Sequence, residues 1–116
     1  MSKQQEVELF IKELQNKVTI FSIVFIDERQ KNAQTILILE ISPAKRTEII
    51  KELNAEDYSE GPIKEELRGY EQMWVFGKLV RKREIYIKIS LGHFNNSAVC
   101  ISFHIAEHKM KYPLKK

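Results

Sequence analysis

Residues 84–91 read Glu-Ile-Tyr-Ile-Lys-Ile-Ser-Leu, and this stretch decides the fold. Isoleucine or leucine fills every second position, and the positions between them hold Glu84, Tyr86, Lys88 and Ser90. Because successive side chains of a β-strand point to opposite faces, the alternation predicts a strand with one apolar and one polar face. The polar face therefore displays Tyr86 and Lys88 side by side.

Two further strand-like runs flank this strand, at residues 73–80 and 98–105. They are joined to it by a basic turn at 81–83 and by a loop at 92–97, which predicts a three-stranded antiparallel meander. In the third run, one set of side chains shares the apolar face and the other set lies opposite. The apolar set is Val99, Ile101, Phe103 and Ile105, and the opposite set is Ala98, Cys100, Ser102 and His104.

The register between the second and third strands follows from these faces. The two apolar sets must lie on the same side of the sheet, because a slip of one residue would turn every side chain to the other face. The compact choice pairs Leu91 with Val99. It places Tyr86 opposite His104 on the polar face, with Lys88 on the same side.

The first strand of the meander can be registered in two ways. Either Trp74, Phe76 and Lys78 share the face of Tyr86, or the alternate set does, and the pattern leaves this open. That alternate set is Met73, Val75, Gly77 and Leu79. Gly77, a glycine inside a strand pattern, marks a bulge or a place where another group approaches the backbone closely.

The first half of the chain supplies helices. Ser2 is placed to cap a helix with apolar residues at helical spacing up to Leu14, and Ser42-Pro43 opens another. Residues 18–26 are rich in β-branched and aromatic side chains and predict a strand. Residues 32–40 could form either element, with helix favoured, and residues 56–69 predict a loop with room for one turn of helix. The expectation is an α+β fold, with N-terminal helices on the apolar face of a small antiparallel sheet that ends in the meander.

Composition places the chain among ordinary globular proteins. Its 116 residues, 43% hydrophobic and 30% charged, predict one domain spanning 1–116. The single cysteine, Cys100, excludes an internal disulfide, and no ligand spacing or phosphate-binding loop predicts a metal or cofactor. No signal-peptide pattern is visible, and the apolar stretches are too short to cross a bilayer. A cytoplasmic protein without membrane contact is expected.

Charge is distributed unevenly along the chain. Residues 1–58 hold eight Lys or Arg against ten Asp or Glu, whereas residues 72–116 hold nine against two. A polyanion such as RNA or DNA would be attracted to the second segment. The alternative is a solubilising tail, since residues 105–116 contain four of those nine basic side chains.

Tyr86, Lys88 and His104 suit one reaction class. Metal-independent RNA cleavage needs a base for the 2′-hydroxyl proton, a positive charge for the phosphorane and an acid for the leaving oxygen. Histidine has an ordinary pKa near neutrality, so His104 is the candidate for proton transfer. Lys88 would stabilise charge, and Tyr86 would orient the phosphate or donate a proton. The competing interpretation is a Tyr–His pair that simply packs and a lysine that is merely solvated.

Other side chains are candidates for binding RNA. Arg81 and Arg83 at the hairpin tip could grip neighbouring phosphates. Trp74 is either a core anchor or a platform on which a base stacks.

Four blocks of sequence between about residues 38 and 104 resemble the MqsR family of bacterial toxins in order and spacing, apart from a shorter hairpin. They are Leu53-Asn54-Ala55-Glu56-Asp57-Tyr58, Met73-Trp74-Val75, Glu84-Ile85-Tyr86-Ile87-Lys88-Ile89 and Val99-Cys100-Ile101-Ser102-Phe103. The resemblance implies a RelE-like fold, mRNA-cleaving endoribonuclease activity without cofactor, and a partner antitoxin that neutralises it. The ribosome is a further candidate partner.

The resemblance also assigns positions in the site. The family's catalytic tyrosine falls on Tyr86, and its C-terminal lysine falls on His104. Two positions depart from the family pattern: a lysine falls on or near Glu60, and a glutamine falls on Val75. Lys78 would replace the charge lost at Glu60 if the first strand's register brings it to that face.

The resulting hypothesis is an endoribonuclease toxin that leaves a 2′,3′-cyclic phosphate and a 5′-hydroxyl. Its catalytic residues would be His104, Tyr86 and Lys88, and its RNA-binding residues would be Lys78, Arg81, Arg83 and Trp74. The alternative is a non-catalytic module of the same fold that binds a partner or nucleic acid.

Overall fold

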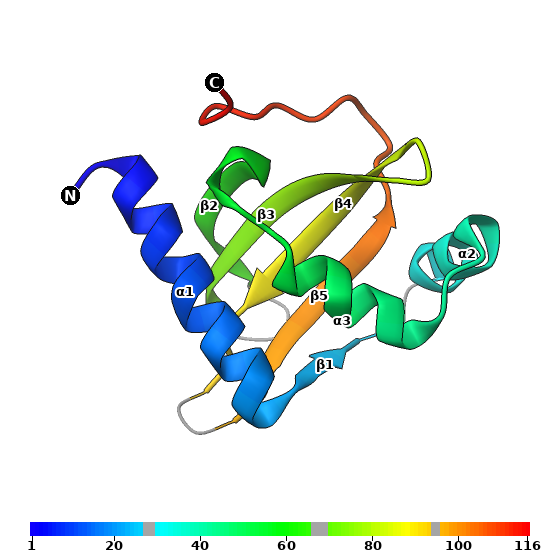
Figure 1. Cartoon of the computed structure of the whole chain (residues 1–116), viewed down its shortest axis with the longest axis horizontal. Coiled ribbons are helices and arrows are strands. Elements are labelled where there is room, and N and C mark those ends of the chain that lie inside the picture. Colours follow the sequence, from blue (N-terminus) through cyan, green and yellow to red (C-terminus); the bar gives the residue numbers. More distant parts are fainter. Residues whose placement is uncertain (27–29, 66–69, 94–95) are drawn as a thin grey trace.

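The fold is α+β, as predicted: helices pack on a five-stranded sheet (Figure 1). The computed structural model describes residues 1–26, 30–65, 70–93 and 96–116. The strand order is β1-β5-β4-β3-β2. Along the chain the elements are α1 (Lys3–Phe21), β1 (Ile23–Phe25), α2 (Gln30–Leu39), α3 (Pro43–Lys51), the 3₁₀ turn η1 (Ala55–Asp57), β2 (Tyr58–Glu65), β3 (Tyr70–Val80), β4 (Arg83–Ser90) and β5 (Ala98–Ile105).

Helix α1 begins at the predicted cap and runs further than predicted. The Ser2 hydroxyl accepts a hydrogen bond from the Gln5 backbone, and the Gln5 side chain accepts from Ser2 in return. The buried stripe of the helix continues to Val18, which keeps the chain helical where the β-branched residues predicted a strand. Only Ile23–Phe25 is extended, and this short strand pairs with β5 in parallel. The sheet is therefore mixed rather than antiparallel.

Helices α2 and α3 confirm two other expectations. Residues 32–40 were favoured as helix, and α2 covers all but the last of them. Helix α3 begins after Ser42, whose hydroxyl accepts from the Lys45 backbone, and Pro43 occupies the first helical turn.

The loop predicted at 56–69 is wrong over residues 58–65, whereas the single helical turn that the prediction allowed is present. Residues 55–57 form η1 and residues 58–65 form β2, an edge strand paired with β3 through several register shifts. Its charged side chains, Gly61 and Pro62 are depleted in regular strands, which explains why the sequence did not predict it. The remainder of the predicted loop, residues 66–69, lies outside the described residues.

The meander forms at the predicted positions, and its first turn decides the open register. The turn is two residues long, Arg81 and Lys82, with φ of 51° and 68°, the conformation that suits a tight hairpin. Tyr86 then lies opposite Gly77, so the set containing Gly77 shares its face.

The pairing of β4 with β5 is partly as predicted. Tyr86 lies opposite His104 and Lys88 opposite Ser102, but the register then shifts, and Ser90 rather than Leu91 pairs with Val99. The extra residue in β5 turns Val99 and Ile101 to the polar face, where they pack with Met73 in a small second cluster. The predicted common face of Val99, Ile101, Phe103 and Ile105 is therefore correct only for its last two members.

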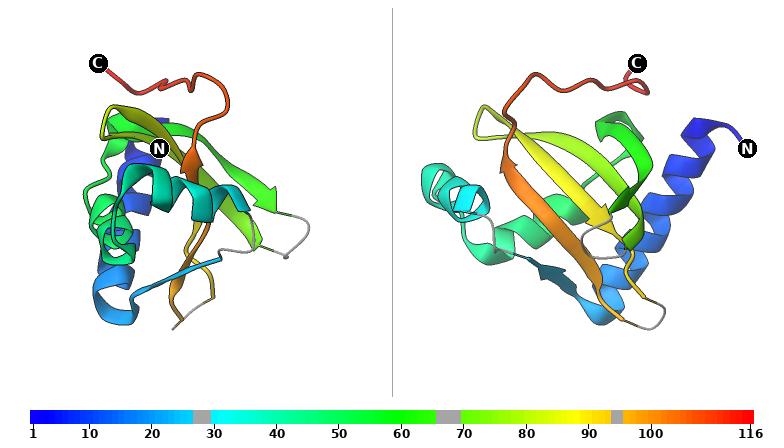
Figure 2. Two further views of the ribbon diagram at one scale, coloured as in Figure 1. Left: turned by 90° about the vertical axis from the view of Figure 1, so that its right-hand side faces the viewer. Right: turned by 180° about the vertical axis from the view of Figure 1, so that it is seen from behind.

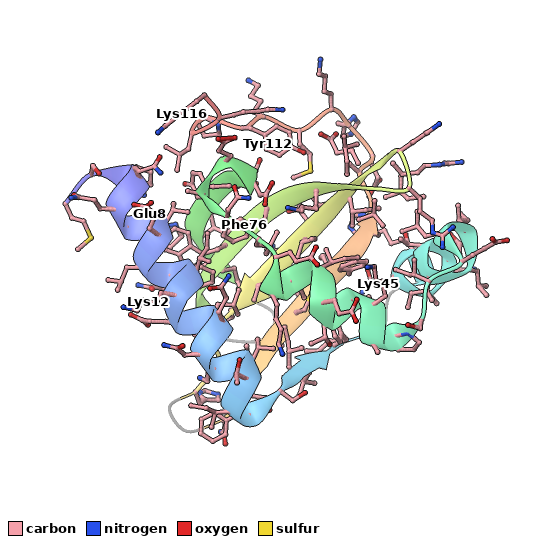
Figure 3. All side chains as sticks on the ribbon, viewed as in Figure 1. Glu8, Lys12, Lys45, Phe76, Tyr112 and Lys116 are labelled. Atoms are coloured by element: carbon pink, nitrogen blue, oxygen red, sulfur yellow. The ribbon has the colours of Figure 1, made fainter. Side chains whose placement is uncertain are left out.

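The two faces of the sheet differ in their cover. Helices α1 and α3 lie over one face, where Phe10 packs on Phe76 between helix and strand (Figures 2 and 3). No described helix lies over the opposite face (Figure 2). We refer to residues 106–116 as the C-terminal strap, because this segment crosses the hairpin end of the sheet (Figure 1). Within the described ranges, no helix is long and apolar enough to span a bilayer.

Candidate functional site

Tyr86 and His104 form a ring pair on neighbouring strands of the sheet. Their rings are stacked, with centroids 5.2 Å apart and planes inclined by 15°. The pairing is the one that strand parity predicted. Tyr86 is half-buried, and His104 is 4% exposed. The pair presents a phenol and an imidazole, two groups able to transfer protons, at one point of the sheet.

The His104 ring is fixed by its own strand. Its Nδ1 lies 3.0 Å from the carbonyl oxygen of Ile105. A carbonyl oxygen only accepts, so Nδ1 carries the hydrogen in this contact, and Nε2 holds the lone pair of the neutral ring. Nε2 is thus the nitrogen that could take a proton from a substrate.

Helix α2 holds the stretch of β5 that carries His104. β1 pairs with β5 only as far as Cys100, and beyond that point side chains of α2 bond the strand edge. The Phe103 backbone N–H donates to Asn32 Oδ1 at 3.2 Å, and the Ile105 N–H donates to Thr35 Oγ1 at 3.0 Å. These two bonds bracket His104, so α2 acts as a polar side-chain continuation of the sheet.

A cleft of about 650 Å³ opens beside the ring pair. Its volume is typical of sites that bind small ligands. Besides Tyr86 and His104, its lining comes from α2, β2 and the C-terminal strap. These lining residues are Lys31, Ser59, Glu60, Glu107, His108, Lys109, Met110 and Lys111. Three lysines face two carboxylates here, which gives the cleft a basic character suited to an anion.

Lys88 shares the polar face but not the lining of the cleft. It lies opposite Val75 on one side and Ser102 on the other. Two residues along a strand separate it from Tyr86, a distance of about 7 Å. Glu60 pairs with Val75 in turn, so the two positions that depart from the family pattern stand in the same cross-strand row as Lys88.

Trp74 and Lys78 lie on the opposite face from the ring pair. Trp74 is 4% exposed and stacks on Phe10 with ring centroids 4.7 Å apart, so it is a core anchor and does not offer a surface to a base. Lys78 Nζ lies 3.1 Å from Asp57 Oδ2. The two-residue turn sets the register that places Trp74 and Lys78 on this face. Lys78 therefore cannot replace the charge lost at Glu60.

Arg81 and Arg83 are exposed at the hairpin tip, outside the lining of the cleft. Arg81 lines a separate hollow of about 440 Å³ between the hairpin and the start of α3. The Glu84 carbonyl, next to Arg83, accepts a hydrogen bond from the Ala106 N–H at 2.8 Å. The hairpin and the beginning of the strap therefore lie side by side, and a strand of RNA could contact both.

The strap is the part of the site that sequence reasoning does not place, since its lysines suit attraction of a polyanion and a solubilising tail equally. Tyr112 donates its hydroxyl hydrogen to Glu84 Oε2 at 2.6 Å, and its ring lies against Gly77. Burial, followed by the hydrogen bond to Glu84, raises the pKa of Tyr112. Gly77 was the available signal: the close approach predicted at this glycine is the contact with Tyr112.

The strap is also tied to α2. Glu107 Oε1 lies 2.6 Å from Lys31 Nζ, on the rim of the cleft. The hydrogen bond to Lys31 lowers the pKa of Glu107. Within the described ranges, no group of three or more His, Cys, Asp or Glu side chains is placed to hold a metal ion.

Comparison with known proteins leaves the site to be interpreted from its own chemistry. The chain matches no family model, no curated protein and no solved structure.

Proposed function

We propose that this chain is a metal-independent endoribonuclease toxin of the MqsR/RelE-like group, acting on mRNA in the bacterial cytoplasm and neutralised by an antitoxin. The observation that carries the proposal is the stacked pair of Tyr86 and His104 in a basic cleft. It supplies proton-transfer groups and a positive field at one place, as transesterification of RNA requires.

The reaction follows from the groups present. A base removes the proton of a 2′-hydroxyl, whose oxygen attacks the adjacent phosphorus, and the bond from phosphorus to the 5′-oxygen breaks. An acid returns a proton to that oxygen, leaving a 2′,3′-cyclic phosphate and a 5′-hydroxyl. His104 Nε2 would serve as base or acid, and the Tyr86 hydroxyl would transfer the other proton or orient the phosphate. Lys88, on the same face, would stabilise the phosphorane.

The family resemblance adds support, because the positions that it assigns to the site lie near one another in the structure. Tyr86, His104 and Val75 all belong to strands of the meander and share the polar face, and Glu60 lines the cleft beside them. An antitoxin could neutralise such a site by covering the cleft, and the ribosome could present the mRNA to it.

A second candidate function rests on burial and charge. His104 exposes 4% of its surface, and the Glu60 carboxylate in the cleft would repel a phosphate. These features favour a module of the same fold that binds RNA or a protein partner without cutting.

The experiment that separates the two is an end analysis of RNA incubated with purified protein in the presence of a chelator. We expect cuts that carry 2′,3′-cyclic phosphate and 5′-hydroxyl ends. His104→Gln removes the group that titrates near neutrality, and Tyr86→Phe keeps the ring stack. Both should slow cutting by about 100-fold or more, as loss of a general acid or base does.

His93→Ala is the matched control, because His93 is exposed and lies outside the cleft. Its cutting rate should equal that of the unaltered protein. Binding of RNA without cuts would support the non-catalytic module and overturn the enzyme. Equal rates for His104→Gln and the unaltered protein would remove His104 from the mechanism.

A further inference from the structure

The C-terminal strap is held by one side chain of the sheet. The two carboxylate oxygens of Glu84 accept one hydrogen bond each, from the Met110 N–H at 3.1 Å and from the Tyr112 hydroxyl at 2.6 Å. The Glu84 carbonyl accepts a third, from the Ala106 N–H at 2.8 Å. A carboxylate that accepts two hydrogen bonds in fixed geometry is a strong anchor for a segment without secondary structure of its own.

The anchor determines which strap residues meet the cleft. Lys109 and Lys111 flank Met110, whose backbone is fixed by Glu84, and both line the cleft together with Tyr86 and His104. Both lysines are exposed. Their ammonium groups therefore remain in water while their stems form the wall of the cleft.

The charge of the strap indicates which kind of ligand this wall of the cleft would bind. The strap contains four lysines and one glutamate, a net charge of +3 with histidine neutral. Its glutamate, Glu107, is paired with Lys31, and therefore does not oppose the other lysines at full strength. A wall of this kind fits the phosphates of a single strand whose sugar reaches the ring pair.

We propose that the strap is the phosphate-binding wall of the RNA cleft, with Lys109 and Lys111 contacting phosphates that flank the scissile one. Glu84 is the positioning residue that holds this wall in place. The inference rests on the proposed function for its substrate class, single-stranded RNA, but it concerns residues that the ring-pair mechanism does not use.

The first test measures binding separately from cutting. The probe is a fluorescein-labelled, 2′-O-methylated RNA strand, which cannot be cut because its 2′-oxygens are blocked. The slope of log Kd against log salt reports the number of phosphate contacts, at about 0.7 per contact for a single strand. Lys109→Gln/Lys111→Gln should lower this slope by about 1.4, and Lys109→Arg/Lys111→Arg should restore it.

The matched control removes the same charge elsewhere. Lys12 on the outer side of α1 (Figure 3) and Lys51 at the end of α3 are exposed and lie outside both the cleft and the strap. Lys12→Gln/Lys51→Gln should leave the slope unchanged. An equal fall in both double variants would mean a diffuse electrostatic effect, and would overturn the proposal.

Glu84→Gln tests the positioning role through the sign of its effect. The substitution raises the net charge by one, so simple electrostatics predicts tighter RNA binding. An amide carries no charge, so neutral and weaker hydrogen bonds replace the charge-assisted bonds to the Met110 N–H and the Tyr112 hydroxyl, and the positioning role predicts a higher Kd, a lower slope and faster hydrogen exchange at Met110. In the Lys109→Gln/Lys111→Gln background the substitution should lower the slope no further. Tighter binding would refute the role of Glu84.

If the Glu84 variant does not fold, Tyr112→Phe tests the anchor instead, since it removes a single hydroxyl from the anchor and leaves the net charge unchanged. The positioning role again predicts a higher Kd and a lower slope. The two proposals fail in different ways. Binding with a lysine-dependent slope but no cutting would refute the enzyme and support the wall. Cutting with an unaltered slope in the lysine variant would support the enzyme and refute the wall.

Discussion

Asn32→Ala should destabilise the protein, because this buried side chain bonds the edge of β5. Asn32 is 1% exposed and donates to the carbonyl oxygens of Ile26 and Ile101 at 3.2 and 3.3 Å. It also accepts from the Phe103 N–H at 3.2 Å. The bonds to the Ile101 carbonyl and the Phe103 N–H are buried, so the substitution leaves buried backbone groups unsatisfied.

The magnitude follows from the three bonds. Each contributes a net stabilisation of about 0.5–1.5 kcal/mol, and an unsatisfied buried partner adds to the cost. The free energy of unfolding should therefore fall by about 2–4 kcal/mol. Domains of this size are stable by about 5–15 kcal/mol, so the variant should still fold and can be measured.

The assay is urea denaturation, with hydrogen exchange as the local probe. The midpoint should fall at an unchanged m-value, and exchange at the Phe103 amide should accelerate before exchange in β4 does. Asn16→Ala is the control, because Asn16 is exposed on α1 and its replacement should change stability by no more than about 0.5 kcal/mol. If the two variants lose equal stability, the side-chain edge of β5 does not contribute as argued.

Two further predictions concern the seat of the strap. Gly77→Ala should detach the strap, because a Cβ at position 77 would lie 2.8 Å from two ring carbons of Tyr112. The free energy of unfolding, measured by urea denaturation, should fall by about 1–2 kcal/mol. In a Tyr112→Ala background this loss should vanish or change sign, and an unchanged loss there would contradict the contact. Tyr112→Phe should reduce the loss of stability in alkali, to which Tyr58 also contributes because burial raises its pKa. Burial and Glu84 raise the folded-state pKa of Tyr112, so its contribution is complete below the unfolded pKa of about 10 and is lost as pH rises from there toward the folded-state pKa. The test is to measure the free energy of unfolding of both proteins between neutral and alkaline pH, with a parallel absorbance titration of tyrosinate. An equal fall of the free energy of unfolding in alkali for both proteins would refute the contribution of Tyr112.

The features that the sequence predicted correctly are those that short-range rules determine. Caps at Ser2 and Ser42 each depend on residues within one helical turn. The face shared by Tyr86 and Lys88 follows from alternation in a strand that is buried on one side only. The cross-strand partner of Tyr86 was predictable because Phe103 and Ile105, which flank His104, do lie on the predicted apolar face.

Strand β5 shows where that reasoning stops. Every residue from Ala98 to His104 is buried, so both of its faces are covered and alternation carries no information about them. The bulge near Ile101 is invisible in such a run, although it decides which residues share the face of His104. The register of such a buried strand is determined by its contacts with neighbouring elements. The residue pattern of the strand alone does not contain this information.

The cleft required contacts between distant parts of the chain. Gly77 indicated that something approaches the backbone of β3, but many segments could have done so. Tyr112 is the residue that does, and it became identifiable only because β5 leaves the sheet beside the hairpin and sends the strap across the end of β3. Local alternation thus places the ring pair, whereas the wall that would bind the substrate depends on Glu84 meeting a segment more than twenty residues away.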